Sequence, residues 1–348
     1  MKIVIYGGHG YQGRLVLAEL ARHDTEIVLA GRNAGRLEAA AAAASRNGTG
    51  TVTATRVADS ADHDALVAAF RDADAVINCA GPFTPQGAAV ARAAVAAGCH
   101  YTDTSGEQFH VKEVYDACAA DAERAGVRVT PAMTDGGVPG DLLARILAEH
   151  LGGGPLEEVL AGHLVTGASG MSRGSLRSLS GTADVLRTGG LAYEKGEWRG
   201  DAEPRLTAID FPGRPGTPVI RFALQEVVTV PRHLDVTRVQ GFAEAGLAEL
   251  FATTVSEEAI AAMPEGPSDE ERRGDHWTIV VQAVAQNGRR ARASAQGPDT
   301  YGTTGVIAAL GTLRMNGPAG GRTPAEVLDP AGFLDALAPY GITWTVDG

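Results

Sequence analysis

The sequence has little cysteine, with only Cys79, Cys99 and Cys118 among its 348 residues. Their spacing includes no CxxC pair, so we expect them to be small buried hydrophobic side chains in a reducing compartment. This excludes a disulfide scaffold. The nine histidines include no pair at the spacing of metal ligands, and we expect no metal site.

The sequence also lacks long apolar runs and an excess of positive charge. No stretch of about eighteen apolar residues occurs, so no membrane span is expected. The first residues, MKIVIYGG, lead from a short apolar run straight into glycines, which is not typical of a signal peptide. A net charge of -12 disfavours nucleic acid as a partner, because such binding depends on cationic neutralisation of phosphates. We therefore expect a cytoplasmic protein that acts on a small molecule.

The most informative feature that is present is a glycine-rich turn directly after the first predicted strand, residues 2–6. Its GxGxxG pattern permits a tight turn, close approach of the backbone to a pyrophosphate, and close packing of the next helix on the strand. Free N–H groups at that helix N-terminus can then face an anion. A tight turn without a ligand is the alternative. The residues predicted to bind the dinucleotide here are Gly8, Gly10, Tyr11, Gln12 and Gly13.

The end of the second predicted strand, residues 26–30, indicates which nucleotide is bound. NAD-specific proteins carry a carboxylate there, about twenty residues beyond the glycines, to hold the ribose hydroxyls. This chain has Arg32 and Asn33 instead. An arginine offers a cation with several donors, suited to a 2′-phosphate that a carboxylate would repel. We therefore expect NADP(H), with a solvated arginine as the alternative.

Strand and helix signals alternate through the first third of the chain, which predicts an α/β fold with a doubly wound parallel sheet of the Rossmann type. Ligands of such sheets gather outside the carboxyl ends of the strands. We accordingly expect Asp59 at the adenine, or as a helix cap, and Ala80, Gly81 and Pro82 beside the cofactor, or as a plain turn. Further strands are predicted at 51–57, 75–78, 100–103 and 128–131, and helices at 64–70, 87–97, 111–125 and 141–150.

The segment LGGGP at 151–155 breaks this alternation and predicts a domain boundary. Beyond it, hairpin signals at Lys195-Gly196 and Asn287-Gly288 predict an α+β domain with an antiparallel sheet. The remaining expectations are loops at 199–218 and 265–275, an extended segment at 218–230, and helices at 303–313 and 333–338.

Seven motifs spread over nearly the whole chain carry a family resemblance. They are YGGHGYQGRLV at 6–16, LAGRN at 29–33, INCAGPF at 77–83, GCHYTDTSGE at 98–107, TDGGVPGDLL at 134–143, SRGSLRS at 172–178 and GPDTYG at 297–302. With these motifs the chain resembles the saccharopine dehydrogenase family, in particular the branch similar to trans-acting enoyl reductases.

The resemblance implies three parts and a dimer. The parts are an NADP-binding domain (1–150), an α+β domain for substrate binding and dimerisation (151–300), and a C-terminal helical segment (301–348) that packs back on the first domain. The implied homodimer is joined through the sheets of the second domain. The segment TDGGVPGD departs from the family's commoner FDSxPSD by losing a hydroxyl and an aromatic side chain.

Hydride transfer requires the nicotinamide to be placed against an electrophilic carbon, after which the protein supplies a proton or a charge. Asp135, in a glycine-rich turn directly after the sheet, is the preferred polar contact, and Tyr101 is the second catalytic candidate. Each is also compatible with a structural role. The full set of candidate proton donors is Tyr101, Asp103, Glu107, His110, Asp135 and Tyr301.

The substrate is expected to meet Phe83 and, if residues 172–178 are helical, Arg173 and Arg177 on one helix face. The arginines could hold a carboxylate or a phosphate, or form a solvated face. Three functions remain open. The first is NADPH-dependent reduction of an imine (C=N) of an amino-acid-derived substrate, which paired arginines would favour. The second is reduction of an activated C=C, which an apolar channel would favour, and the third is NADPH binding without catalysis, as a sensor or scaffold.

Overall fold

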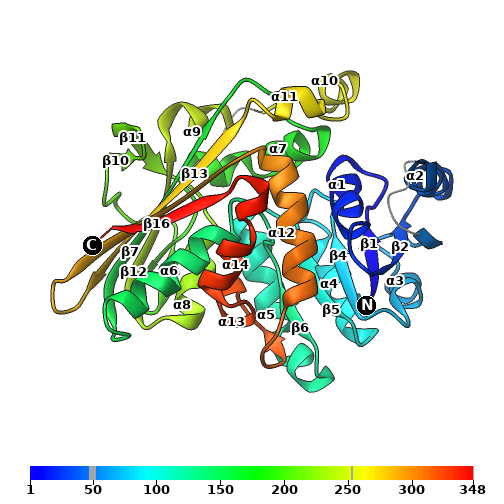
Figure 1. The fold of residues 1–348 in the computed structure, drawn as a ribbon, viewed down its shortest axis with the longest axis horizontal. Helices are drawn as coiled ribbons and strands as arrows, with labels where there is room; N and C mark the ends of the chain where they lie inside the picture. Colours follow the sequence, from blue (N-terminus) through cyan, green and yellow to red (C-terminus); the bar gives the residue numbers. More distant parts are fainter. Residues whose placement is uncertain (47–51, 252–253, 348) are drawn as a thin grey trace.

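A computed structural model describes residues 1–46, 52–251 and 254–347 of the chain. Figure 1 shows two sheets on either side of helix α12 (Thr300–Arg314), with the N-terminus beside one sheet and the C-terminus beside the other. We call the sheet of the N-terminal strands sheet A and the other sheet B. None of the helices in the described part of the chain has both the length and the apolar character needed to cross a bilayer.

Sheet A is parallel, with seven strands in the order β15-β6-β5-β4-β1-β2-β3. The strand order reverses between β1 and β4, as in a doubly wound fold, and this confirms the predicted fold class. Its strands are β1 (Lys2–Tyr6), β2 (Glu26–Gly31), β3 (Val52–Val57), β4 (Ala75–Asn78), β5 (His100–Asp103), β6 (Arg128–Thr130) and β15 (Gly320–Gly321). Its crossover helices are α1 (Tyr11–Leu20), α2 (Ala34–Arg46), α3 (His63–Phe70), α4 (Gly87–Ala96) and α5 (Gln108–Ala125). Thr51, the first residue of the strand expected at 51–57, lies outside the described residues.

Strand β1 shows why a strand of this sheet is a continuous apolar segment in the sequence. Ile3 and Ile5 pack into the core on one face, whereas Val4 and Tyr6 pack into a second core on the opposite face. Successive side chains of a strand alternate between the two faces, and helices cover both faces of a parallel sheet. Each face of β1 is therefore buried.

Sheet B follows the path β10-β11-β12-β7-β13-β14-β16, with β8 paired to β12 and β9 paired to β8. The predicted antiparallel sheet is in fact mixed, because its central strands β7 and β12 are parallel. The two predicted hairpins are present, and both Lys195 and Gly196 have the positive φ angles that a two-residue hairpin turn requires. The strands are β7 (Leu156–Thr166), β8 (Ala192–Glu194), β9 (Glu197–Arg199), β10 (Ala208–Phe211), β11 (Arg214–Arg221), β12 (Val236–Glu244), β13 (His276–Ala285), β14 (Arg290–Pro298) and β16 (Thr343–Asp347).

Three expectations for the second half of the chain were wrong. The loop expected at 199–218 contains β10 and the start of β11, and the loop expected at 265–275 contains helix α11 (Asp269–Arg272). The extended segment expected at 218–230 ends with helix α8 (Glu226–His233). Its β-branched run Val227–Val230 favours a strand locally, but these side chains are almost fully buried in a helix that packs on α6 (Val138–His150).

The C-terminal segment contributes to both sheets. Helix α12 packs on α1, β15 extends sheet A beside β6, and β16 extends sheet B beside β14. Helix α6 lies against β13 and β14 of sheet B. The remaining helices are α7 (Arg173–Arg187), α9 (Ala245–Phe251), α10 (Glu257–Ala262), α13 (Pro324–Val327) and α14 (Pro330–Ala336).

Gly13 should be the position in the glycine turn least able to accept a side chain. A Cβ atom there would lie 2.4 Å from the Gly7 carbonyl oxygen and 2.8 Å from Gly8 Cα, both backbone atoms. We predict that Gly13→Ala lowers the free energy of unfolding by roughly 1–3 kcal/mol, because α1 must move off β1. Denaturant titration measures this. In the control Gly35→Ala, the nearest atom to the new Cβ is 3.8 Å away, and stability should be unchanged or higher. Equal stability of the two variants would contradict the packing argument.

Candidate functional site

The carboxyl ends of the sheet A strands open onto a cavity of about 1000 Å³. Its other wall is formed by β7, α7 and residues 222–225. Among the described residues, the predicted site residues that line it are Gly10, Tyr11, Gln12, Arg32, Ala80, Gly81, Pro82, Phe83, Asp135, Arg173 and Arg177. Gly8, Gly13, Asn33, Asp59 and Tyr101 do not line it.

The glycine turn presents free backbone donors to this cavity. Gly7 takes the left-handed conformation (φ +81°) that makes the turn, and Gly10 N–H donates to the Gly7 carbonyl oxygen at 2.9 Å. Gly8 and Gly13 lie beneath the turn, where a Cβ atom would meet Leu29 or the backbone. No side chain caps the N-terminus of α1, so its first N–H groups and the helix dipole are available to an anion.

The loop after β2 places two arginines at one end of the cavity. Arg32 follows the strand directly, and Arg36 lies in the first turn of α2, where its N–H donates to Asn33 Oδ1 at 3.0 Å. Within the described residues, neither guanidinium has a hydrogen-bond or ion-pair partner. Burial, followed by the charge of Arg36, lowers the pKa of His9, which lines the same end. Two cations beside a neutral imidazole suit a phosphate monoester.

Asp59, expected at the adenine, is exposed and lies outside the cavity. Its Oδ1 accepts from the Ala61 N–H at 2.9 Å, while the neighbouring Ser60 lines the cavity. The N-cap of α3 is Asp62, whose side chain accepts from the Ala65 N–H. Asp59 thus orders the turn that carries Ser60.

The loop after β4 is held by the carboxylate of Glu107. Glu107 Oε1 accepts from the Phe83 N–H at 2.8 Å, and Oε2 accepts from both the N–H and the hydroxyl of Thr84. Because its two oxygens accept hydrogen bonds from Phe83 and Thr84, Glu107 holds the loop that carries Ala80–Phe83 in place. Burial raises the pKa of Cys79, at the start of this loop, to about 12, so its thiol stays protonated and is no nucleophile.

Three of the candidate proton donors form a buried cluster behind the cavity wall. Tyr101 and Asp103 share one face of β5, and the Tyr101 hydroxyl donates to Asp103 Oδ2 at 2.9 Å. The same oxygen lies 2.8 Å from His110 Nε2, and all three residues are fully buried. Burial raises the pKa of Tyr101 well above its ordinary value. The structure does not bring Tyr101 to the cavity, and nothing in its position supports a catalytic role.

Asp135 does reach the cavity, on the turn between β6 and α6. Its Oδ1 accepts from the Thr304 hydroxyl at 2.7 Å, and the Asp135 backbone N–H donates to the Thr304 hydroxyl oxygen at 3.1 Å. Burial raises the pKa of Asp135, while the Thr304 hydrogen bond and the charge of His163 oppose the shift. The carboxyl therefore keeps its proton to a higher pH than an exposed aspartate does.

Arg173 and Arg177 share one face of α7, as predicted, but both are engaged. The Arg173 guanidinium donates to the Met263 carbonyl oxygen, with Nε at 2.7 Å. Arg177 Nε lies 3.0 Å from both carboxylate oxygens of Glu257. Neither arginine is free to hold a substrate carboxylate in this arrangement.

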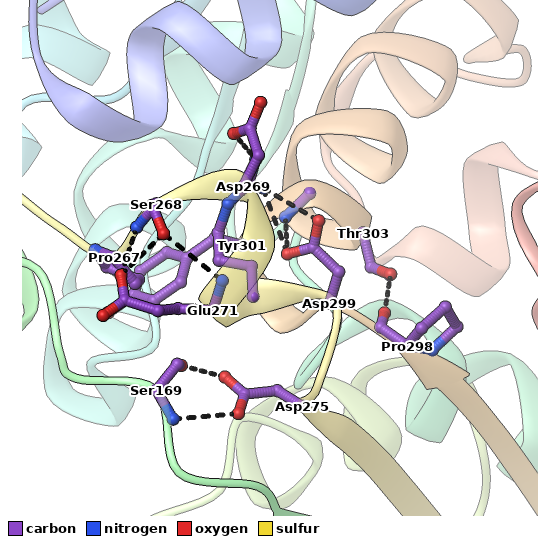
Figure 2. A network of polar contacts seen from close by, with 12 residues as sticks. Ser169, Pro267, Ser268, Asp269, Glu271, Asp275, Pro298, Asp299, Tyr301 and Thr303 are labelled. Carbon is purple, nitrogen blue, oxygen red and sulfur yellow. Dashed lines mark hydrogen bonds and ion pairs between the residues drawn. The ribbon is translucent and has the colours of Figure 1, made fainter.

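A polar network fixes the wall beside α7. Figure 2 shows Ser169 facing Asp275 and Ser268 facing Glu271, which form two hydrogen bonds and a capping box. The Tyr301 hydroxyl accepts from the Ser172 N–H at 2.8 Å and lies 2.9 Å from Ser175 Oγ. The Tyr301 ring also meets the ring of Tyr11 edge-on at 5.1 Å. Tyr301 therefore joins the glycine turn to the N-terminus of α7.

The part of the cavity between α7 and sheet B is mainly apolar. Its lining includes Val165, Leu179, Val185, Leu186, Phe222, Leu224, Leu247 and Leu250. Leu250 is 54% exposed and Phe109, which also lines the cavity, is 40% exposed. Large exposed apolar side chains on a cavity lining are suited to an apolar ligand.

Comparison with known proteins identifies the N-terminal half of this site. Residues 3–132 match the family described as the saccharopine dehydrogenase NADP binding domain. This confirms the resemblance carried by the motifs and the predicted cofactor, NADP(H).

Two curated relatives extend the match beyond residue 132 or overlap with it. The chain is 32% identical over 225 residues to a lipid droplet localized protein of Caenorhabditis elegans, covering 61% of this chain and 52% of that protein. It is 31% identical over 146 residues to a trans-acting enoyl reductase of Mycobacterium ulcerans, covering 40% of this chain and 34% of that protein. The chain spans about half the length of the Caenorhabditis elegans protein and about a third of the Mycobacterium ulcerans protein.

A solved structure shares the fold over the full length. Saccharopine dehydrogenase (L-Glu forming) from Saccharomyces cerevisiae superposes with a TM-score of 0.61 at 16% identity, covering 100% of both chains. At this level of identity, the likeness concerns the fold alone.

Three residues at or behind the cavity wall were missed by sequence reasoning: Arg36, His163 and Glu226. Arg36 stands four residues after Arg32, so the spacing on the first turn of α2 could have indicated it. His163 lines the cavity with its Nε2 3.0 Å from Glu226 Oε1. No local pattern links these two, because they are 63 positions apart.

The two arginines of the NADP binding domain should decide coenzyme preference. We predict that Arg32→Ala and Arg36→Ala each raise the Kd for NADPH by roughly ten- to hundredfold and leave the Kd for NADH nearly unchanged, because only NADPH has a 2′-phosphate. Calorimetric titration measures both. The matched control is Arg22→Ala, which removes an exposed arginine that lies just after α1 and pairs with Glu19, and this variant should bind both coenzymes normally. Equal losses for the two coenzymes would refute the assignment.

Proposed function

We propose that the chain is an NADPH-dependent oxidoreductase that reduces an activated C=C bond, conjugated to a carbonyl, in an apolar acyl substrate. The observation that carries this proposal is the apolar lining between α7 and sheet B, next to the loop 80–83 that would flank the nicotinamide. The match to a protein named trans-acting enoyl reductase supports it. Each relative is only partly covered, so the activity is inferred from the site.

Reduction of an amino-acid imine is the weaker candidate. Such a substrate carries a carboxylate that requires a cation, and Arg173 and Arg177 were the pair expected to supply it. Both are engaged, with the Met263 carbonyl and with Glu257. An anionic substrate would have to replace these partners, whereas an apolar chain needs no such exchange.

Different groups of residues would bind different parts of NADPH and of the substrate. The N–H groups of Tyr11 and Gln12 would hold the pyrophosphate, Arg32 and Arg36 the 2′-phosphate, and Ala80–Phe83 the nicotinamide. NADPH, when bound, supplies a hydride. A protonated Asp135 carboxyl can donate a hydrogen bond to the substrate carbonyl oxygen, where negative charge develops as the C=C accepts the hydride. Phe83 would pack on the substrate.

Several further properties belong to the same proposal. They are a homodimer joined through sheet B, a cytoplasmic location, and the division at 150 and 300 into NADP-binding, substrate and C-terminal parts. Gly348, the last residue of the third part, lies outside the described residues. Non-catalytic binding of NADPH is the remaining alternative.

Asp135 should be required for the rate of reduction, measured as kcat. Asp135→Ala removes the hydrogen-bond donor, and we predict that kcat falls roughly 10²–10³-fold. Asp135→Asn keeps a donor and should lose much less.

The stability effect of Asp135 has a defined sign. Because its pKa is raised on folding, ionisation of this carboxyl destabilises the folded state. Relative to Asp135→Asn, the unmodified protein should therefore lose stability as the pH rises from the unfolded value near 3.8 through the raised folded value. Thermal unfolding over this range measures it, and parallel pH curves for the two proteins would contradict the prediction.

The substrate class is tested by a panel of acceptors. We expect oxidation of NADPH, followed by its absorbance, with 2-enoyl thioesters of N-acetylcysteamine, and faster turnover with a decenoyl than with a crotonyl chain. Mixtures of glutamate or lysine with an aldehyde should give no oxidation. Oxidation by the imine mixtures alone would overturn the proposal, and binding of NADPH without oxidation by any acceptor would favour a non-catalytic role.

A further inference from the structure

A histidine paired with a buried carboxylate stands in the substrate wall of the cavity. His163 lies on β7, with its side chain 14% exposed, and it lines the cavity beside Asp135 and Gln225. Glu226 begins α8 and is fully buried. His163 Nε2 and Glu226 Oε1 are 3.0 Å apart. An ionised carboxylate only accepts hydrogen bonds, so Nε2 of the imidazole carries the proton.

The surroundings of Glu226 leave its carboxylate dependent on His163. A Cβ atom on Gly140 would lie 1.9 Å from Glu226 Oε1, so only a glycine on α6 leaves room for this carboxyl group. Glu226 Oε2 has no hydrogen-bond partner in the part of the chain that the structure describes. A buried carboxylate is costly unless it is paired, and His163 is the partner within hydrogen-bond distance.

The edge of the His163 imidazole that carries Cε1 and Nδ1 faces the turn between β6 and α6, which carries Asp135 and Gly136. A Cβ atom built on Gly136 would lie 3.4 Å from His163 Cε1 and 3.7 Å from Nδ1. The charge of His163 also acts on Asp135 across the same space. Glu226 therefore holds Nε2 at the back while Nδ1 is directed toward the place where Asp135 meets the substrate.

We propose that His163, oriented by Glu226, is the proton donor that completes reduction of the C=C bond; this rests on the function proposed above. Reduction adds one hydride and one proton. The hydride from NADPH forms the C–H bond at the β-carbon, and the electron pair of the C=C bond moves onto the carbonyl oxygen beside Asp135. That pair then returns to form the α-carbon C–H bond with the proton from His163 Nδ1. The imidazole is left neutral and regains a proton from solvent. Glu226 is a positioning residue.

The orientation of His163 can be tested without any substrate. In protein labelled with ¹⁵N-histidine, the His163 signals are assigned by their loss in His163→Asn. Long-range proton–nitrogen spectra should show the neutral ring protonated at Nε2, and Glu226→Ala should abolish this preference. A neutral ring protonated at Nδ1 would overturn the inference, because Nε2 would then lack the proton that it donates to Glu226.

The catalytic role is tested with the decenoyl thioester of N-acetylcysteamine and NADPH. His163→Ala should lower kcat roughly 10²–10⁴-fold without changing the KM for NADPH, and added imidazole should restore part of the rate. Glu226→Gln, which keeps an acceptor but removes the charge, should show an intermediate loss. The matched control is His23→Ala, since His23 Nε2 lies 3.1 Å from Glu19 Oε1 in a similar pair that does not line the cavity.

The outcomes separate the two proposals. An active unmodified protein whose kcat is unchanged in a folded His163→Ala variant would overturn the proton-donor role alone. A loss of rate in His163→Ala that imidazole does not restore, together with a raised KM for NADPH, would also overturn it, because it indicates a structural role. If the unmodified protein oxidises no NADPH with any enoyl thioester, the proposed function fails and the proton-donor role fails with it; the spectra then decide only whether Glu226 orients His163.

Discussion

The site depends on how the buried carboxylate of Asp103 is satisfied. Its Oδ1 accepts from the N–H groups of Ser105 and Ala132 at 3.1 and 2.9 Å, and its Oδ2 is bonded by Tyr101 and His110. A carboxylate removed from water is tolerated only when its oxygens are paired in this way. These four partners come from β5, the loop that leads to Glu107, the turn that leads to Asp135, and α5. One side chain thus sets the relative positions of the segment that leads to Glu107, which holds the loop Ala80–Phe83, and of the turn that leads to Asp135.

The cavity combines two sources of specificity. Sheet A supplies the groups that any dinucleotide-binding fold must place at the carboxyl ends of its strands: free N–H groups, a cation at the end of β2, and a loop after β4. Sheet B and α7 contribute to the apolar lining, and β7 of sheet B and α8 supply the pair formed by His163 and Glu226. Related chains can therefore share a cofactor site and still reduce different bonds, because the substrate wall comes from a separate part of the sequence.

Sequence reasoning succeeded where the determining contacts are local. The strands of sheet A follow from short apolar or β-branched runs that alternate with helical segments, and the coenzyme follows from Arg32 standing where a carboxylate is usual. It failed where partners are distant. Arg173 and Arg177 do share a helix face, but their partners Met263 and Glu257 lie 90 and 80 residues away, so no local pattern shows that they are engaged. Helix α8, which carries Glu226, was missed because its β-branched residues favour a strand and only packing on α6 makes it a helix.

The C-terminal segment gives the two sheets an unusual connection. The chain passes from sheet A to sheet B through α6, returns through α12 to β15, and crosses again to place β16 at the far edge of sheet B. Proteins that close around a ligand by hinge motion move their lobes about a few residues in the connecting segments. Here three covalent crossings, two of which end in hydrogen-bonded edge strands, oppose such a swing. A molecule entering this cavity would pass through local displacement of the rim at Leu250 and Phe109, and the lobes themselves would stay in register.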